Sequence, residues 1–233
     1  MRHEPVSLSL DVDSDALLDL IALRQALVFL GHHSIGRDIL DGLWDLASAL
    51  GVEAAISHAP IGENGDPLGK IDDFEARALA SGADIVAMKL CFADFHPHSE
   101  VDRLLGAYRR TVLRLKSAGL RVLHVTAPLH ARQTDPASRL KRMLQRPVWE
   151  DHANLKRLEY NEKLCAAVAG EPLFDLADAQ STRPDGTKEL HPVRARLVPM
   201  LWPGWTRDGA HLNEPGKRMA ARKFVRAVAD ALS

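Results

Sequence analysis

Five short runs along the chain are nearly continuous in apolar residues, many of them β-branched. A run of this length without alternation of polar and apolar positions is typical of a strand that is covered on both faces of a sheet. We therefore predict five buried strands. They cover Leu27–Gly31, Val52–His58, Asp84–Cys91, Leu120–Thr126 and Pro172–Leu176.

Between these runs the apolar residues follow helical spacing instead. They recur every three or four positions over 39–50 and again over 104–115, which places them on one face of a helix. Gly119 follows the second segment, where a glycine commonly ends a helix. Strands that alternate with helices predict a three-layer α/β/α fold around a five-stranded parallel sheet.

Two further helices are expected near the end of the chain. The segment 150–169 has a helical pattern that Gly170 ends. A final helix starts after Asn213, with Pro215 in its first turn, where the missing N–H of proline costs nothing. Either Asn213 or Asp208 is placed to cap this helix.

The start of the chain is expected to add one helix outside the alternating pattern. This helix covers 12–26, with Asp13 or Ser14 as its cap. We accordingly divide the chain into an N-terminal extension, 1–26, and one α/β domain, 27–233.

Composition narrows the class of protein without identifying it. The 233 residues are 46% hydrophobic and carry 30 Lys and Arg against 31 Asp and Glu, so neither nucleic acid nor an anionic membrane is an expected partner. Cys91 and Cys165 are too few for a disulfide framework. No run of 18 apolar residues predicts a membrane span.

Acidic residues near the start, such as Glu4 and Asp11, argue against a secretory leader in the sequence as given. This sequence is therefore expected in the cytoplasm; it would be secreted or periplasmic if a leader had been removed. The sequence does not indicate an oligomeric state.

Residues of types that are common in catalytic sites follow each predicted strand. The carboxyl ends of parallel strands meet at one edge of a sheet, and sites gather there. We therefore expect one site built from several of them. They are Ser34 after the first strand, Gly62 and Asn64 after the second, Asp94 after the third, His130 after the fourth, and Asp208 with His211 after the fifth.

Ser34 is the candidate nucleophile. It lies in the segment 31–36, which reads GHHSIG, between a predicted strand and a predicted helix. A serine hydroxyl attacks well when an imidazole takes its proton and a carboxylate orients that imidazole. Asp208 and His211 have the three-residue offset that allows this contact. The alternative is that Ser34 only caps the helix and that Asp208 and His211 are turn and surface residues.

The order of serine, aspartate and histidine, with the last two as Asp-x-x-His before the final helix, resembles the SGNH (GDSL-type) hydrolases. The resemblance runs from about Leu27 to the last helix. It implies a flavodoxin-like fold and a triad of Ser34, Asp208 and His211. The first block departs from the family pattern, because no acid precedes Ser34 and one extra residue separates it from the glycine.

The resemblance also implies an oxyanion hole. The family uses the serine amide, a glycine after the second strand and an asparagine after the third, which correspond here to Ser34, Gly62 and Ala93. Alanine has no side-chain donor, so Asn64 is our first replacement and Lys89 or Lys70 the second. Asn64 is equally well interpreted as a turn residue.

Five residues are expected to line the substrate site: His33, Lys89, Asp94, Trp202 and Trp205. The two tryptophans lie in the segment 181–207, which we expect to be long, irregular and next to the site, and which could stack on a sugar or acyl group. Alternatively the tryptophans pack in the core, His33 is a hydrogen-bonded turn residue, and Asp94 holds the turn after the third strand. No metal or other cofactor is expected.

The sequence thus predicts a serine esterase that acts on a carboxylic ester, with a small molecule or a glycan ester as substrate. Two alternatives stay open. One is a catalytically weak domain of this fold that binds a glycan or acyl group, which the departure at Ala93 keeps in view. The other is an acyltransferase with the same triad.

Overall fold

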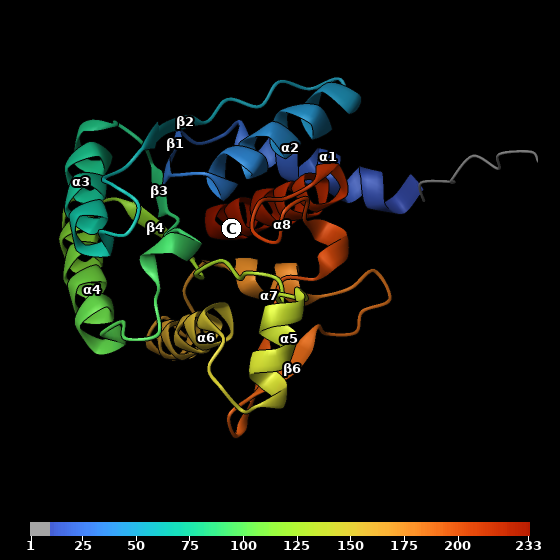
Figure 1. The fold of residues 1–233 in the computed structure, drawn as a ribbon. Helices are drawn as coiled ribbons and strands as arrows, with labels where there is room; N and C mark the ends of the chain where they lie inside the picture. The colour runs from blue at the N-terminus through green and yellow to red at the C-terminus, as the bar shows by residue number, and fades with distance from the viewer. Residues whose placement is uncertain (1–9) are drawn as a thin grey trace, which may run out of the picture.

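The computed structural model describes the backbone of residues 10–233 and the side chains from residue 14 onward (Figure 1). Its five-stranded parallel sheet has the order β2-β1-β3-β4-β5, and this confirms the predicted fold class. The strands are β1 (Val28–His32), β2 (Ser57–Pro60), β3 (Ile85–Met88), β4 (Arg121–Val125) and β5 (Leu173–Phe174).

The second strand is shorter than predicted. Only Ser57–Pro60 pairs with β1, whereas 52–56 approaches the sheet as extended chain without a strand partner. In this segment Val52, Ala54 and Ile56 pack partly buried against the core, while the residues between them face solvent. The edge position explains the difference, because an edge strand is covered on fewer sides than a central one.

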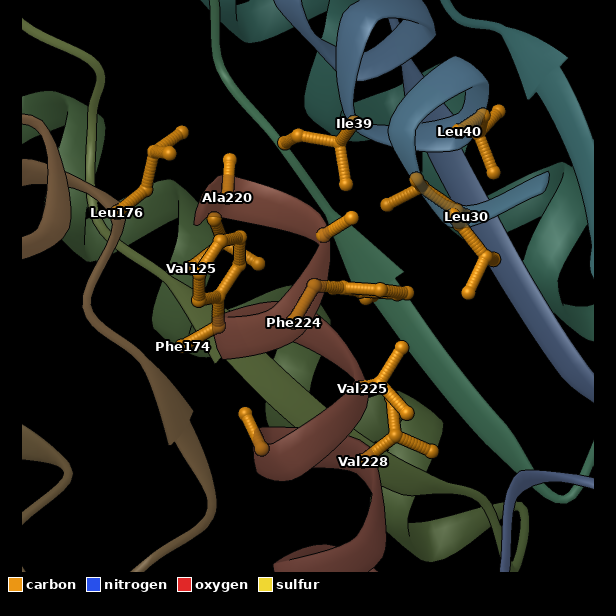
Figure 2. Packing of buried hydrophobic residues seen from close by; sticks show 14 of the residues in the cluster. Leu30, Ile39, Leu40, Val125, Phe174, Leu176, Ala220, Phe224, Val225 and Val228 are labelled. Carbon is orange, nitrogen blue, oxygen red and sulfur yellow. The ribbon is translucent and has the colours of Figure 1, made fainter. Parts of the chain in front are cut away.

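Helices cover both faces of the sheet (Figure 1). One face carries α1 (Leu10–Leu23), α2 (Ile35–Ala49) and α8 (Glu214–Leu232), and the other carries α3 (Pro67–Ala80), α4 (Val101–Ser117) and α6 (Trp149–Ala167). Figure 2 shows the first core, where Leu30 and Val125 of the sheet meet Ile39 of α2 and Phe224 of α8. Continuous apolar runs in the strands follow from burial between two such layers.

The pairing of α2 with α8 is unusually close at one point. A Cβ added at Gly42 would lie 2.4 Å from the Lys217 backbone oxygen, so only glycine fits there. Asn213 caps α8 by accepting a hydrogen bond from the Gly216 amide at 3.0 Å. The N-termini of α2 and α8 therefore lie at the same end of the sheet.

Two expectations about local structure were wrong. The described part of helix α1 covers Leu10–Leu23, so positions 13 and 14 lie within a helix and not at its start. Acidic and small polar residues suit the first turns of a helix as well as its cap. The segment 181–207 is not irregular, because it contains the antiparallel hairpin β6 (Leu190–Val193) and β7 (Arg196–Pro199).

The remaining elements are short and lie around the carboxyl end of the sheet. The hairpin packs Val193 and Val198 against α6. The others are α5 (Pro136–Met143), α7 (Leu176–Ser181) and the 3₁₀ turns η1 (Phe92–Asp94) and η2 (Pro203–Trp205). Within residues 10–233 no helix has the length and apolar character that a membrane crossing requires.

Candidate active site

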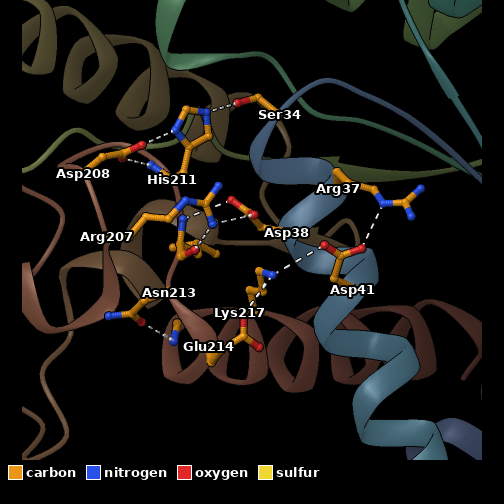
Figure 3. Close-up of polar contacts among 12 residues, drawn as sticks. Ser34, Arg37, Asp38, Asp41, Arg207, Asp208, His211, Asn213, Glu214 and Lys217 are labelled. Carbon is orange, nitrogen blue, oxygen red and sulfur yellow. Dashed lines mark hydrogen bonds and ion pairs between the residues drawn. The ribbon is translucent and has the colours of Figure 1, made fainter.

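Ser34 lies at the turn between β1 and α2 with its backbone at φ 51° and ψ −105°. A positive φ is rare for a residue with a side chain and is often found at functional turns. The hydroxyl makes no cap bond to α2, so the helix-cap interpretation is wrong. Instead Ser34 Oγ lies 2.6 Å from Nε2 of His211 (Figure 3).

Asp208 and His211 are held together by a tight turn before α8. Nδ1 of His211 lies 2.7 Å from Oδ2 of Asp208. The other carboxylate oxygen, Oδ1, accepts the backbone amides of Ala210 at 2.9 Å and His211 at 2.7 Å. Gly209 makes the turn possible, because its φ of 92° suits glycine.

The electrostatics of the turn keep the Asp208 carboxyl ionised. Burial raises its pKa, but the backbone amides of His211 and Ala210 and the side chain of His211 all donate to it and bring the pKa down to about 2. An ionised carboxylate at Nδ1 favours the tautomer with the proton there. Nε2 of His211 is then an acceptor that faces the Ser34 hydroxyl.

A second carboxylate, on α2, fixes the loop that carries this pair. Asp38 is buried and accepts the Leu212 amide at 3.0 Å through Oδ2. Its Oδ1 contacts the Arg207 guanidinium at 3.4 Å, and Arg207 also donates to the Leu212 carbonyl at 2.7 Å (Figure 3). Sequence reasoning missed Asp38, since an acidic residue in the first turn of a helix is common for other reasons.

The expected oxyanion donors differ in their availability. No backbone hydrogen bond in residues 10–233 uses the Ser34 amide as donor, and this amide lies at the positive end of α2. The Gly62 amide, by contrast, donates to Oδ2 of Asp73 at 2.9 Å. Asn64 is exposed, and its Oδ1 accepts from Lys70 at 2.8 Å, so its amide nitrogen is directed away from that ammonium group.

Asp94 and Lys70 form a buried ion pair behind this loop. Lys70 Nζ contacts both oxygens of Asp94, at 2.8 and 2.9 Å. Asp94 also accepts the Cys91 amide at 2.6 Å and the Gly65 amide at 3.0 Å. Asp94 therefore holds the turn after β3, as the alternative interpretation had it. Its oxygens are occupied within the protein, and a contact between Asp94 and substrate stays a prediction.

Lys89 also lies deeper than expected. It follows β3, and its side chain is 1% exposed. Its Nζ has no hydrogen-bond partner in the described part of the chain, and neither has Nδ1 of the buried His32. Burial lowers the pKa of Lys89 to about 8 and that of His32 to about 4. Lys89 does not present its ammonium group to a substrate at the surface.

His33 and the two tryptophans have mainly structural contacts. Nε2 of His33 lies 2.8 Å from the carbonyl oxygens of both Ile61 and Gly62. Trp205 donates from Nε1 to the Thr182 carbonyl at 2.8 Å and packs against the core. The ring of Trp202 lies edge-on to it, with centroids 4.9 Å apart. Both tryptophans are partly exposed.

Sequence reasoning placed His130 at this edge of the sheet but did not single out Phe92, whose ring lies against the catalytic candidate His211. The ring of Phe92, in η1, lies edge-on to that of His211 at a centroid distance of 5.8 Å. His130, after β4, contacts the same phenylalanine at 5.9 Å. The position of His130 after a strand was the only available signal. In residues 10–233 no group of three or more His, Cys, Asp or Glu side chains is placed to hold a metal ion.

Comparison with known sequences gives no relative. No protein-family model matches the chain, and no curated protein sequence matches it. The chain is similar only to solved structures, and the sequence identities are low enough that they show a shared fold and nothing more.

Three of these structures cover most of the chain. A proposed acylhydrolase from Bacteroides fragilis has a TM-score of 0.61 and 18% identity, and the alignment covers 89% of this chain and 88% of that one. A lipase/acylhydrolase from Enterococcus faecalis has a TM-score of 0.57 and 16% identity, with 87% and 95% covered. The acetyl xylan esterase AlAXEase has a TM-score of 0.54 and 20% identity, with 86% and 98% covered. Other neighbours include a GDSL-like lipase from Bacteroides thetaiotaomicron. The chain therefore has the fold of the SGNH/GDSL-type hydrolases.

Proposed function

We propose that the protein is a serine hydrolase that cleaves a carboxylic ester. The observation that carries the proposal is the continuous chain of contacts from Ser34 Oγ through the His211 ring to Asp208, at 2.6 and 2.7 Å. These residues come from two turns that are far apart in the sequence. A serine hydroxyl, an imidazole and an ionised carboxylate in this order form an activated nucleophile.

In the proposed mechanism each proton passes through His211. Nε2 of His211 takes the Ser34 hydroxyl proton as Oγ bonds to the ester carbonyl carbon. The alcohol then leaves with that proton, and an acyl-serine remains. Water, deprotonated by the same nitrogen, attacks the acyl carbon, and the carboxylic acid leaves as Ser34 recovers its proton. Asp208 stays ionised throughout and stabilises the imidazolium.

The negative charge on the carbonyl oxygen needs donors. The Ser34 amide is unused and is our first donor, and the side-chain amide of Asn64 is the second. The Gly62 amide becomes a donor only if Asp73 releases it. The alcohol side of the ester could be a carbohydrate, because one protein of the same fold is an acetyl xylan esterase and the partly exposed Trp202 and Trp205 can stack on a sugar.

One observation favours a second candidate, a domain of this fold that binds a glycan or acyl group with little turnover. Ala93 offers no side-chain donor and the Gly62 amide is engaged. Losing one oxyanion donor typically costs on the order of a hundredfold in rate.

Labelling with a fluorophosphonate probe, followed by peptide mass spectrometry, separates the two. We expect one adduct on Ser34 that disappears in Ser34→Ala and His211→Ala. Ser48→Ala is the matched control, since Ser48 is exposed on the same helix α2. Absence of an adduct in protein with a native circular-dichroism spectrum and a cooperative melt would refute the hydrolase and leave the binding domain. Turnover of acetylated sugars against short aryl esters then defines the substrate.

A further inference from the structure

A hollow whose lining does not include Ser34 is rich in arginines. It is a groove of about 690 Å³ between α5, the start of α6 and the turn of the β6–β7 hairpin. Arg132, Arg142, Arg146 and Arg194 all line it. A neighbouring hollow of about 320 Å³ shares two of these side chains and adds Arg139. We call the larger hollow the arginine groove.

The positive charge of the arginine groove is mostly uncompensated. Asp151 is its only lining carboxylate, and it is bound by Arg142 through two hydrogen bonds of 2.6 and 2.8 Å. Arg132 contacts a histidine instead, with Nη1 2.9 Å from Nδ1 of His191. Arg146 and Arg194 take part in none of the ion pairs found in residues 10–233. Guanidinium groups that converge on a groove without carboxylate partners are suited to a carboxylate or phosphate ligand.

The loop after β4 joins the groove to the triad. The ring of His130 contacts Phe92, which lies against His211. The next residue, Ala131, donates its amide to the Gly209 carbonyl at 2.7 Å, inside the turn that carries the triad. Arg132 follows directly and lines the groove. The segment 130–132 therefore connects the turn that carries Asp208 and His211 to Arg132 in the arginine groove.

We propose that the arginine groove binds an anionic group, a carboxylate or a phosphate, on the same molecule whose ester is cleaved at Ser34. This inference rests on the proposed function and narrows it to acidic esters long enough to reach both places, such as an O-acylated oligosaccharide that carries a sugar acid or a sugar phosphate. The guanidiniums of Arg146 and Arg194 are the proposed ligands of the anion. Neutral esters would react at the triad without this contact.

Matched substrates test the proposal. We would compare three acetylated oligosaccharides that differ only in a terminal glucose, glucuronic acid or glucose 6-phosphate, and thereby separate the carboxylate from the phosphate. The wild type should favour at least one anionic ester in kcat/KM. In Arg146→Gln/Arg194→Gln this preference over the neutral ester should fall tenfold or more, because charge-assisted hydrogen bonds are lost. Added salt should weaken the wild-type preference.

The control removes the same charge elsewhere. Arg109 and Arg110 are exposed on α4, so Arg109→Gln/Arg110→Gln should keep the anionic preference. An equal loss in the control would mean that net charge alone attracts the substrate, and the groove proposal would be wrong. The same conclusion follows if the wild type shows no preference for either anionic ester.

A binding measurement keeps this test separate from the proposed activity. Calorimetry on Ser34→Ala with glucuronate and glucose 6-phosphate should detect binding that Arg146→Gln/Arg194→Gln removes in the same background. Anion binding by Ser34→Ala, together with absence of a fluorophosphonate adduct on folded wild type, would support the groove and refute the hydrolase. Labelling of Ser34 in the wild type, with no anion binding to Ser34→Ala, would support the hydrolase and refute the groove.

Discussion

Two buried lysines should respond in opposite directions to the same substitution. Lys70 and Lys89 are both almost wholly inaccessible. The Lys70 ammonium contacts both oxygens of Asp94 and the Asn64 carbonyl, whereas Nζ of Lys89 has no partner among the described residues. Replacing either by methionine keeps most of the apolar stem and removes the charge.

Lys89→Met should stabilise the protein at pH 7. Burial lowers the pKa of Lys89 from the ordinary 10.5 to about 8, so the charged form is disfavoured in the folded state by about 3 kcal/mol, at about 1.4 kcal/mol per pKa unit. A lysine with a lowered pKa costs stability below pH 8, and the cost disappears as the pH rises towards 10.5. The gain from the substitution should shrink to about 1 kcal/mol at pH 10.

Lys70→Met should instead cost about 3–5 kcal/mol, because it leaves the carboxylate of Asp94 buried and unpaired. Asp94 also holds the amides of Cys91 and Gly65, so the turn after β3 should loosen. The two variants differ in sign although they remove the same chemical group at a similar depth.

Urea denaturation at pH 7 and pH 10 measures both effects as changes in the free energy of unfolding. Lys223→Met is the control, since Lys223 is exposed on α8 and should change stability by less than about 0.5 kcal/mol. A Lys89→Met protein that is less stable than the wild type at pH 7 would refute the reasoning. It would mean that the Lys89 ammonium has favourable partners that outweigh its burial.

Three further predictions concern the triad. In Asp208→Asn the backbone amides that donate to Oδ1 should hold the carbonyl oxygen of the new amide, so its NH₂ group should face Nδ1 of His211. This contact imposes the wrong tautomer on His211 and should lower kcat by about 10⁴. A loss of less than tenfold in steady-state assays would contradict this. Asn64→Ala should lower kcat about a hundredfold with little change in KM, and a change in KM alone would remove Asn64 from the oxyanion hole. Because the pKa of Asp208 is about 2, its carboxylate should stay ionised between pH 4 and 7, so Asp208→Asn should lower kcat/KM by a similar factor throughout this range. A loss that shrinks towards pH 4 would indicate that Asp208 is protonated there.

Sequence patterns were enough to predict the sheet and to single out Ser34, Asp208 and His211, whose side chains lie in contact. Apolar runs and glycine-ended helices are local signals, and Ser34 and His211 lie at the ends of strands or before helices, where topology brings residues together. The hairpin at 190–199 was missed because each of its strands contains a proline, which normally argues against a strand. A two-stranded ribbon has free edges that tolerate it.

The sequence could not predict which hydrogen-bond donors already have a partner within the protein. The Gly62 amide is bound by Asp73, eleven positions away on α3, and no local motif records that contact. Likewise the sequence does not distinguish Lys70 from Lys89, since only the packed structure shows which ammonium faces a carboxylate. Hydrogen-bond partners depend on tertiary distances of a few tenths of an ångström.

The contact between Ser34 and His211 joins residues 177 positions apart, and this separation has a consequence for folding. Closing so long a loop is entropically costly, and contacts of high sequence separation tend to form late. Asp38 on α2 holds the loop before α8, so docking of these two helices brings His211 to Ser34, the proposed nucleophile. Regain of Ser34 labelling during refolding should therefore lag behind formation of the sheet, and the hydroxyl becomes an indicator of the completed fold.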